Sequence, residues 1–420
     1  MFPFDKKIRA AYFLITSLLV ACVFLVSTCN FNSGDEKLTG IVHPSGEEFA
    51  GSESCKQCHQ SIADSFGETP HFLTSRPGSK ATVKGNLDSG ENVLALNERL
   101  KVFIEERDGK VYQRASVNGK DVDTKPIDIS VGSGRQGQTY LYWQGDSLFQ
   151  LPASYHAAAK AWANSPGYPS DQIVFNRSIS ARCLECHSTY FKVERTFGDV
   201  ETFARSKVLL GVDCERCHGP SARHVNFHRE HPDETKARHV INTQKLEKKL
   251  RLDNCALCHS GMRTNLMPSF SYVAGDNLDK YFIQGFNADS GSTLDVHGNQ
   301  VGLLTASKCY QMSEMDCSSC HNVHMKETKN LELFSTRCMN CHQAEGKNFC
   351  KQPPVPGLIL SKNCIDCHMP SLPSRKVFLQ SPGTTRPTPF FVRTHLVGNY
   401  KKQVEIFLER IGKDSVESNK

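Results

Sequence analysis

Seven copies of one five-residue pattern, Cys-x-x-Cys-His, constrain this chain of 420 residues more than any other feature of its sequence. The copies begin at positions 55, 183, 214, 255, 317, 338 and 364 and are called motifs 1 to 7 here. Together they use 14 of the 18 cysteines and seven of the 17 histidines. Independent placement of these residue types would give roughly 0.03 copies in the whole chain, so the repetition has a chemical cause.

The spacing is the one that covalent attachment of haem requires. Two thiols three positions apart reach the two vinyl groups on one edge of a porphyrin, and the adjacent histidine binds the iron. Seven covalently attached c-type haems are therefore the predicted cofactors. The predicted attachment residues are Cys55, Cys58, Cys183, Cys186, Cys214, Cys217, Cys255, Cys258, Cys317, Cys320, Cys338, Cys341, Cys364 and Cys367. The predicted proximal iron ligands are His59, His187, His218, His259, His321, His342 and His368.

Zinc ribbons are the alternative, because they also use Cys-x-x-Cys pairs. Zinc would not require a histidine directly after every second cysteine. Ribbons also take such pairs two at a time, whereas this chain has seven. The pattern therefore favours haem.

Each iron also needs a distal ligand, and ten histidines lie outside the motifs, enough for bis-histidine ligation of seven irons. His324 lies three residues after His321, on the same helical face, so we expect it to serve a neighbouring haem. His224 has a similar relation to His218. Sequence context selects His71, His224, His297, His324, His395, His156 and His239 as distal candidates. Sequence context supports six other residues less strongly than most of these as distal ligands: His231, His228, His43, Met262, Met325 and Met369.

Two further cysteines, Cys309 and Cys350, flank motifs 5 and 6. In an oxidising compartment two leftover thiols favour a disulfide bond, and two buried thiols are the alternative.

The N-terminus predicts export. Three basic residues precede an apolar run over residues 10–26, which ends at Ser27-Thr28-Cys29. We expect a lipoprotein acylated on Cys29, in the periplasm or outer cell envelope. An uncleaved anchor and a free periplasmic protein remain alternatives, and Cys22 fits a lipobox locally but would leave apolar residues behind it.

The spacing of the motifs suggests the organisation of the chain. Strand-like segments and Asp-Gly and Asn-Gly turns predict a small antiparallel β unit between motifs 1 and 2. The fold expected is a mostly α and irregular multihaem cytochrome c fold with a small antiparallel β insertion and a core packed by haem. The expected divisions are 1–28 (signal peptide or anchor), 29–50 (tether), 51–79 (first haem module), 80–178 (β-rich insertion), 179–400 (six-haem domain) and 401–420 (polar C-terminal tail).

The formal charge of +6 does not indicate a nucleic-acid partner. Seven ferric haems with their propionates would add a charge of about −7, and the basic residues are dispersed along the sequence. The expected partners are redox proteins, such as a membrane quinol oxidase module or a periplasmic reductase, and a membrane reached through an N-terminal lipid or helix.

Several short segments resemble the cytochrome c-552/c-554-type multihaem cytochromes, relatives of hydroxylamine oxidoreductase and pentahaem nitrite reductase. The resemblance covers roughly residues 50 to 400. It rests on Thr69-Pro70-His71, Cys-His-Gly-Pro-x-x-x-His at 217–224, Cys-His-Asn-Val-His at 320–324, Cys-His-Met-Pro at 367–370, and the segments 140–143 and 148–152. It implies haems stacked in close parallel and perpendicular pairs, bis-histidine ligation and electron relay.

The sequence departs from the catalytic members of that group. Pentahaem nitrite reductases usually place a lysine in one motif, but every motif here ends in histidine, and hydroxylamine oxidoreductases carry eight haems. Electron transfer is therefore the favoured function. A multihaem oxidoreductase acting on a small nitrogen or sulfur compound at one five-coordinate haem remains the alternative, so enzymatic activity stays undecided.

Overall fold

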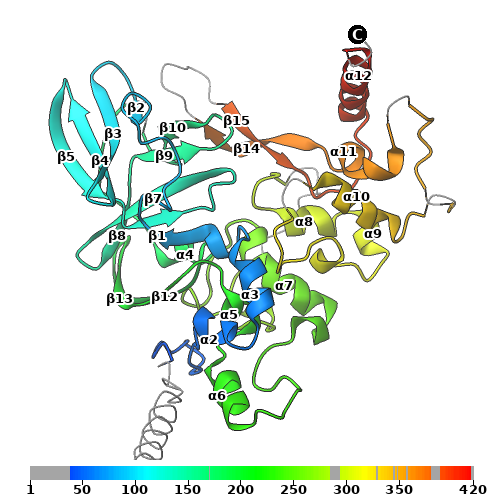
Figure 1. Ribbon diagram of the computed structural model, residues 1–420, viewed down its shortest axis with the longest axis horizontal. Coiled ribbons are helices and arrows are strands. Elements are labelled where there is room, and N and C mark those ends of the chain that lie inside the picture. The colour runs from blue at the N-terminus through cyan, green and yellow to red at the C-terminus, as the bar shows by residue number, and fades with distance from the viewer. Residues whose placement is uncertain are drawn as a thin grey trace, which may run out of the picture. The chain divides into compact units, whose positions relative to one another are not determined.

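The computed structural model describes residues 38–169, 171–283, 294–327, 330–343, 346–347, 349–355, 358–379 and 388–417 (Figure 1). The chain divides into two compact units, Met1–Leu38 and Thr39–Lys420, and all seven motifs lie in the second. The predicted signal or anchor and the acylation candidate Cys29 fall outside the described residues and stay predictions. In the described part of the chain, no helix is both long and apolar enough to cross a bilayer.

A four-stranded antiparallel sheet follows motif 1, in the order β2-β3-β4-β5. The strands are β2 (Val93–Ala95), β3 (Leu100–Arg107), β4 (Lys110–Val117) and β5 (Lys120–Pro126). Two-residue turns join β3 to β4 and β4 to β5, and Asp108 and Asn118 each adopt a φ of 52° there. Asp-Gly and Asn-Gly tolerate the positive φ angles that such hairpins need. The hairpin predicted at Asp108-Gly109 and the turn predicted at Asn118-Gly119 are both confirmed.

A second, seven-stranded sheet has the order β1-β6-β7-β8-β11, with β9 pairing both β7 and β10. Its strands are β1 (Ser75–Pro77), β6 (Ile129–Val131), β7 (Gly137–Gln144), β8 (Ser147–Gln150), β9 (Ala153–His156), β10 (Ala161–Asn164) and β11 (Arg177–Ser178). Alternate side chains of a strand point to opposite faces. Tyr140 and Tyr142 accordingly pack with Val102 and Ile104 of the first sheet. Leu141 packs with Leu184 of motif 2. The sheet thus seats motif 2 on one of its faces.

Two long hairpins complete the β structure. They are β12 (Ser188–Phe197) with β13 (Val200–Leu210), and β14 (Ser371–Leu379) with β15 (Thr388–Arg393). The first begins directly after motif 2 and the second shortly after motif 7. Each therefore extends from a predicted haem attachment site.

Short helices carry the motifs. The α-helices are α2 (Ser52–Lys56), α3 (Gln60–Gly67), α4 (Ala181–Leu184), α5 (Cys214–His218), α6 (Ala222–Glu230), α7 (Lys248–His259), α8 (Gln300–Thr305), α9 (Lys308–Gln311), α10 (Leu331–Met339), α11 (Cys364–His368) and α12 (Lys401–Glu417). The 3-10 turns are η1 (Phe72–Thr74), η2 (Thr243–Lys245), η3 (Leu278–Lys280), η4 (Cys317–Ser319) and η5 (Leu360–Lys362). Helical residues three apart share a face, so a helix or 3-10 turn that carries a motif presents both of its thiols on one side.

The prediction of a mostly α fold is wrong. Helices hold 27% of the residues and strands another 27%. The expected β insertion is present, but the β12–β13 and β14–β15 hairpins lie inside the region predicted as a six-haem domain. Their strands carry many charged, exposed residues, so their sequences lack the apolar alternation that reveals a strand.

Candidate haem-binding site

A cavity of about 3,020 Å³ runs past the motifs. Pockets for ordinary small ligands have volumes of about 300–1,000 Å³, so this space suits several large groups. All seven motif histidines line it, as do all motif cysteines except Cys183. Cys183 lies instead in a small surface depression beside Ser178 and Ser180.

Four pairs of histidine rings face each other in this cavity, and each pair joins one motif histidine to one histidine outside the motifs. Two imidazoles bound to one metal through bonds of about 2 Å hold their ring centres about 6.3 Å apart. The observed separations and interplanar angles are 6.4 Å and 12° for His59–His224, 6.1 Å and 9° for His218–His324, 6.3 Å and 26° for His321–His395, and 6.0 Å and 84° for His71–His259. The spacing is therefore that of bis-histidine iron.

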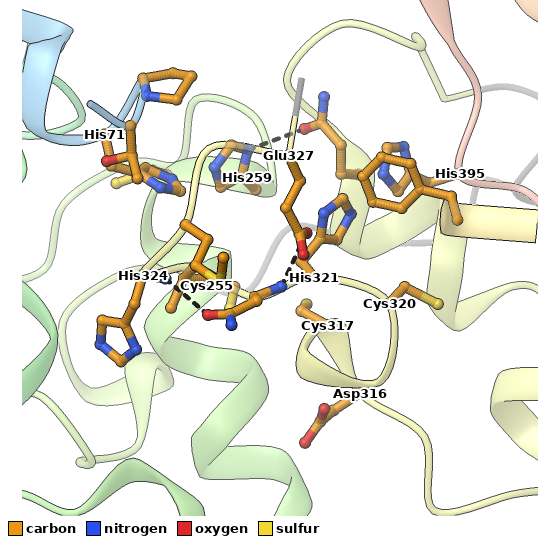
Figure 2. A pocket seen from close by; sticks show the side chains of 18 of the residues that line it. His71, Cys255, His259, Asp316, Cys317, Cys320, His321, His324, Glu327 and His395 are labelled. Carbon is orange, nitrogen blue, oxygen red and sulfur yellow. Dashed lines mark hydrogen bonds between the residues drawn. The ribbon is translucent and has the colours of Figure 1, made fainter. Parts of the chain in front are cut away.

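Figure 2 shows the centre of the cavity, where His71, His259, His321, His324 and His395 come together from separate parts of the chain. His324 stands opposite a motif 3 histidine although it follows motif 5 directly in sequence. His224 likewise stands opposite motif 1 rather than motif 3, which it follows. Each of these two histidines therefore faces the histidine of a motif other than the one it follows, as expected from their positions in the sequence.

His297 lies near His187 of motif 2. Burial is the main cause that lowers the pKa of His187, and the neighbouring His259 and His297 lower it further. His187 Nδ1 is 3.1 Å from Thr74 Oγ1. The structure thus brings five of the seven distal candidates close to a motif histidine.

Hydrogen bonds at Nδ1 show which nitrogen of a ring is available to iron. Nδ1 of His218, His224 and His368 lies 2.8, 2.7 and 2.9 Å from the backbone oxygens of Ile241, Arg238 and Gly398, respectively. A carbonyl oxygen only accepts, so Nδ1 carries the proton and Nε2 keeps its lone pair for a metal.

The opposite pattern occurs at His43 and His156. Nδ1 of each accepts a backbone N–H at 3.0 Å, from Ser45 and Ala159 respectively. The proton of the neutral ring is then on Nε2, which is unsuited to bind iron. His43 is 4% exposed and packs against Phe49. Burial, aided by a nearby arginine, lowers the pKa of His43 to about 4.

The other candidates differ in position. His156 lines the cavity, with its ring 4.4 Å from that of Phe390, but it has the unsuited protonation pattern. His239 contacts Phe227 and does not line the cavity. His231 also stacks on Phe227 away from the cavity lining. The structure gives the proposed ligation by His156 and His239 no geometric support.

One edge of haem carries propionates, which accept hydrogen bonds. Buried donors on the cavity wall match such a group. Arg216 Nε, Asn254 Nδ2 and His228 Nε2 are buried, and none has a hydrogen-bond partner within the described residues. All three residues line the cavity. Buried polar atoms are normally satisfied, so an anionic group in this cavity would complete them. Sequence reasoning missed Arg216 and Asn254, although both stand inside or directly beside a motif.

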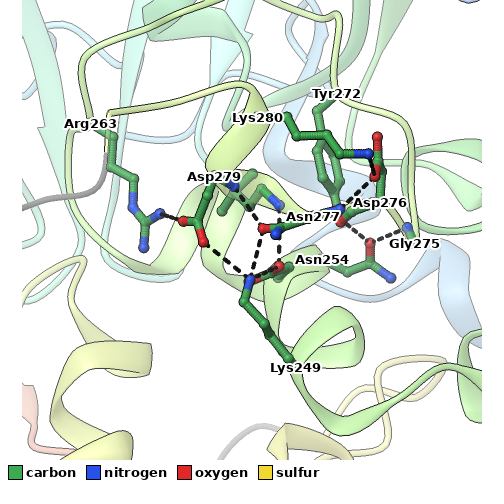
Figure 3. Close-up of polar contacts among 11 residues, drawn as sticks. Lys249, Asn254, Arg263, Tyr272, Gly275, Asp276, Asn277, Asp279 and Lys280 are labelled. Atoms are coloured by element: carbon green, nitrogen blue, oxygen red, sulfur yellow. Dashed lines mark hydrogen bonds and ion pairs between the residues drawn. The ribbon is translucent and has the colours of Figure 1, made fainter.

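Asn254 is fixed by the loop that follows α7. Its Oδ1 accepts from Tyr272 Oη at 2.7 Å and from the backbone N–H of Gly275 at 3.0 Å (Figure 3). Lys249 reinforces the same loop through ion pairs with Asp253 at 2.7 Å and Asp279 at 3.4 Å. The network holds motif 4, at the end of α7, in a fixed position.

The predicted disulfide bond is absent from the structure, where Cys309 and Cys350 are both free thiols. Cys309 is close enough to Cys320 to act on its pKa, whereas Cys350 acts on Cys367. The two thiols therefore lie beside different motifs.

Residues 139–219 match the family model of cytochrome c554 and c-prime. The matched segment begins in β7 and contains motifs 2 and 3 in full. This segment is similar to that of multihaem c-type cytochromes. The resemblance predicted from the motifs is confirmed, and with it covalent haem binding and a general role in electron transfer.

No curated protein matches this sequence. Among solved structures, that of the outer cell wall cytochrome OcwA matches with 17% identity and a TM-score of 0.48, over 85% of this chain and 81% of that one. A TM-score at this level does not establish a common fold. The family relationship therefore rests on residues 139–219.

Thiols of different motifs lie close to one another. Cys55 acts on the pKa of Cys214, Cys186 on that of Cys258, Cys317 on that of Cys255, and Cys364 on that of Cys338. Weaker electrostatic contacts join Cys217 to Cys255 and Cys320 to Cys338. Each contact links two motifs, so the attachment sites form a connected set.

Proposed function

We propose that this protein is an extracytoplasmic heptahaem cytochrome that transfers electrons through an array of mainly bis-histidine haems. The observation that carries the proposal is the set of four histidine pairs separated by 6.0–6.4 Å. His297 beside His187 supports a fifth pair. Haem bound at these sites supplies reversible one-electron chemistry at iron.

The thiol contacts support an order of the motifs in space that differs from their order in sequence. Cys55–Cys214 joins motif 1 to motif 3, and Cys217 with Cys255 joins motif 3 to motif 4. Further contacts lead through motifs 5 and 6 to motif 7. Motif 2 joins this series at motif 4 through Cys186 and Cys258. We infer a path 1-3-4-5-6-7 with a branch to motif 2 at motif 4.

Surface exposure supports electron exchange at particular positions. Cys58 of motif 1, Cys183 of motif 2 and Cys341 of motif 6 are exposed, while the other motif cysteines are partly buried. The ends of the inferred path at motifs 1 and 2 are thus accessible to redox partners. The N-terminal export pattern supports a location outside the cytoplasm, with membrane attachment through a lipid on Cys29 or through an uncleaved helix.

A second function is favoured by one observation at motif 7. His368 has its Nδ1 hydrogen bond, so its Nε2 is available to iron. His156, the cavity histidine that packs on β15, has the wrong protonation pattern to complete that site. An open iron there would bind a small nitrogen or sulfur compound.

Intact mass of the purified, denatured holoprotein tests the proposed function. The expected result is one species carrying seven haem masses. Replacement of Cys338 and Cys341 by alanine removes the attachment points of one motif and should lower the count to six. A wild-type mass with fewer than seven haems, or with zinc and no haem, would contradict the proposal.

A further inference from the structure

A buried charge cluster occupies the place where motifs 2, 3 and 4 meet. Glu185, between the two cysteines of motif 2, is 1% exposed and receives Arg182 Nη1 at 3.1 Å. Arg216, between the two cysteines of motif 3, is 6% exposed, and its Nη2 lies 3.7 Å from Glu185 Oε1. The same Nη2 donates to the Glu185 backbone oxygen at 2.9 Å, while Glu185 Oε1 also accepts the Phe270 N–H at 2.7 Å.

The cluster has one more positive than negative charge. Two guanidinium groups share one carboxylate, and both keep a buried donor without a partner in the described part of the chain, Arg182 Nη2 and Arg216 Nε. The donors around Glu185 therefore exceed what one carboxylate can satisfy. The protein's own side chains therefore leave one positive charge in excess here, placed to act on an anionic group in the cavity, and electrostatic interactions are strong there because the interior dielectric is low.

Other charged groups nearby face elsewhere. Glu215 accepts backbone N–H groups from Ala50, Gly51 and Ser221, at the start of the motif 1 segment. Asp213 accepts from Ser52 Oγ and from the backbone of Cys214. These two carboxylates point toward motif 1, so they do not neutralise the guanidinium groups on the other side of motif 3.

The positive charge lies close to attachment residues of two motifs. Arg182 Nη1 is 3.7 Å from the sulfur of Cys186 in motif 2. Arg216 acts electrostatically on Cys186 and on Cys258 of motif 4. The cluster therefore lies where the path inferred above divides.

We propose that the buried cluster of Arg182, Glu185 and Arg216 sets the reduction potential at the meeting point of motifs 2, 3 and 4, where its two arginines raise the potential and Glu185 partly offsets them. The inference rests on the proposed function, because a reduction potential requires haem at these motifs. Charge and hydrogen bonding near a haem tune its potential, and a positive charge favours the reduced iron. Electrons would then be drawn to the junction before they leave along either branch.

Spectroelectrochemical titration of the holoprotein tests the inference through two substitutions with opposite signs. Arg216→Gln removes a positive charge and should shift one or more components to lower potential. Glu185→Gln removes the negative charge at nearly constant shape and should shift components to higher potential. Arg223→Gln is the matched control, because Arg223 pairs with Glu47 on the surface at 62% exposure, and it should leave the titration unchanged.

A merely structural cluster would behave differently. Loss of packing would move both neutral variants in the same direction, or would leave the titration unmoved, and either result would overturn the inference. If Glu185→Gln fails to fold, Arg182→Gln and Arg216→Lys replace it. The inference requires that Arg182→Gln, which removes a positive charge, lowers the potential, and that Arg216→Lys, which keeps the charge, does not. If the variants carry seven haems by mass but their potentials are unshifted, only the role of the cluster is rejected. If the wild-type protein lacks haems, the proposed function is rejected.

Discussion

At the residue scale, the hydrogen bond at Nδ1 and a place on the cavity wall together distinguish the candidate iron ligands from other histidines, because His231 also donates from Nδ1 to the Phe227 carbonyl at 3.1 Å but does not line the cavity. Where a backbone carbonyl accepts from Nδ1, as at His224, Nε2 is available to iron. Where Nδ1 itself accepts, as at His43, the ring belongs to the protein core. The residue type and its distance from a motif predict candidates, but the partner at Nδ1 comes from a distant or irregular segment. The sequence therefore places His71 and His395 among the candidate distal ligands, but it cannot exclude His156.

Removal of one distal histidine tests the pairing directly. His324→Ala takes away the ring that stands 6.1 Å from His218, so the iron of motif 3 should become high-spin. The mass should still show every haem, because no thioether bond is changed. His231→Ala, which removes a ring stacked on Phe227 away from the cavity lining, is the control and should keep the wild-type spectrum. An unchanged low-spin spectrum in His324→Ala would remove His324 from the ligands.

The buried His43 predicts a dependence of stability on pH. Its pKa falls from 6.5 in the unfolded chain to about 4 in the folded protein, so the folded state prefers the neutral ring. The contribution of His43 is present above pH 6.5 and is lost as the pH falls from 6.5 toward 4, by about 3 kcal/mol in total. Denaturant unfolding of the holoprotein should show this loss, and His43→Gln should show a smaller one. Equal slopes for the two proteins would contradict the assignment.

At the element scale, turns with strict backbone demands were predictable, whereas strands and helices without apolar periodicity were not. Asp108-Gly109 correctly predicts a hairpin and Asn118-Gly119 a turn, which joins a second pair of strands. The long β12–β13 hairpin was missed because its tip is polar and its pairing is interrupted by bulges. Residues 401–420, expected to be a polar tail, contain α12, which packs against α11 through contacts that a local pattern does not reveal.

Glu215 joins two of these elements. It is 4% exposed, and it accepts N–H groups that precede α2 and α6, which carry motif 1 and the distal candidate His224. Glu215→Ala would leave two buried N–H groups and the partly buried N–H of Gly51 without an acceptor, and should lower the free energy of unfolding by about 2–4 kcal/mol. Thermal unfolding and limited proteolysis near residue 50 would measure the change. Glu47→Ala, at an exposed ion pair, is the control, and equal effects of the two substitutions would contradict this role.

At the scale of the whole molecule, the order of motifs in space could not be predicted from their order in sequence. The number of motifs fixes the number of attachment sites, but the contacts that connect them join cysteines from 18 residues apart, Cys320 and Cys338, to 159 residues apart, Cys55 and Cys214. Cys55 approaches Cys214 across motif 2 and the whole β unit, and Cys186 approaches Cys258 across motif 3. Those approaches depend on how the seven-stranded sheet seats motif 2 and how buried side chains such as Glu185 lock neighbouring motifs together.

Electron paramagnetic resonance of the oxidised holoprotein, with and without cyanide, tests the central claim most directly. Near-parallel ring pairs, as in His59–His224 and His218–His324, should give rhombic low-spin signals. The pair His71–His259, with planes at 84°, should add a strongly anisotropic low-spin signal. These signals should not change with cyanide. Mainly high-spin signals that shift on cyanide addition would contradict an array of bis-histidine haems.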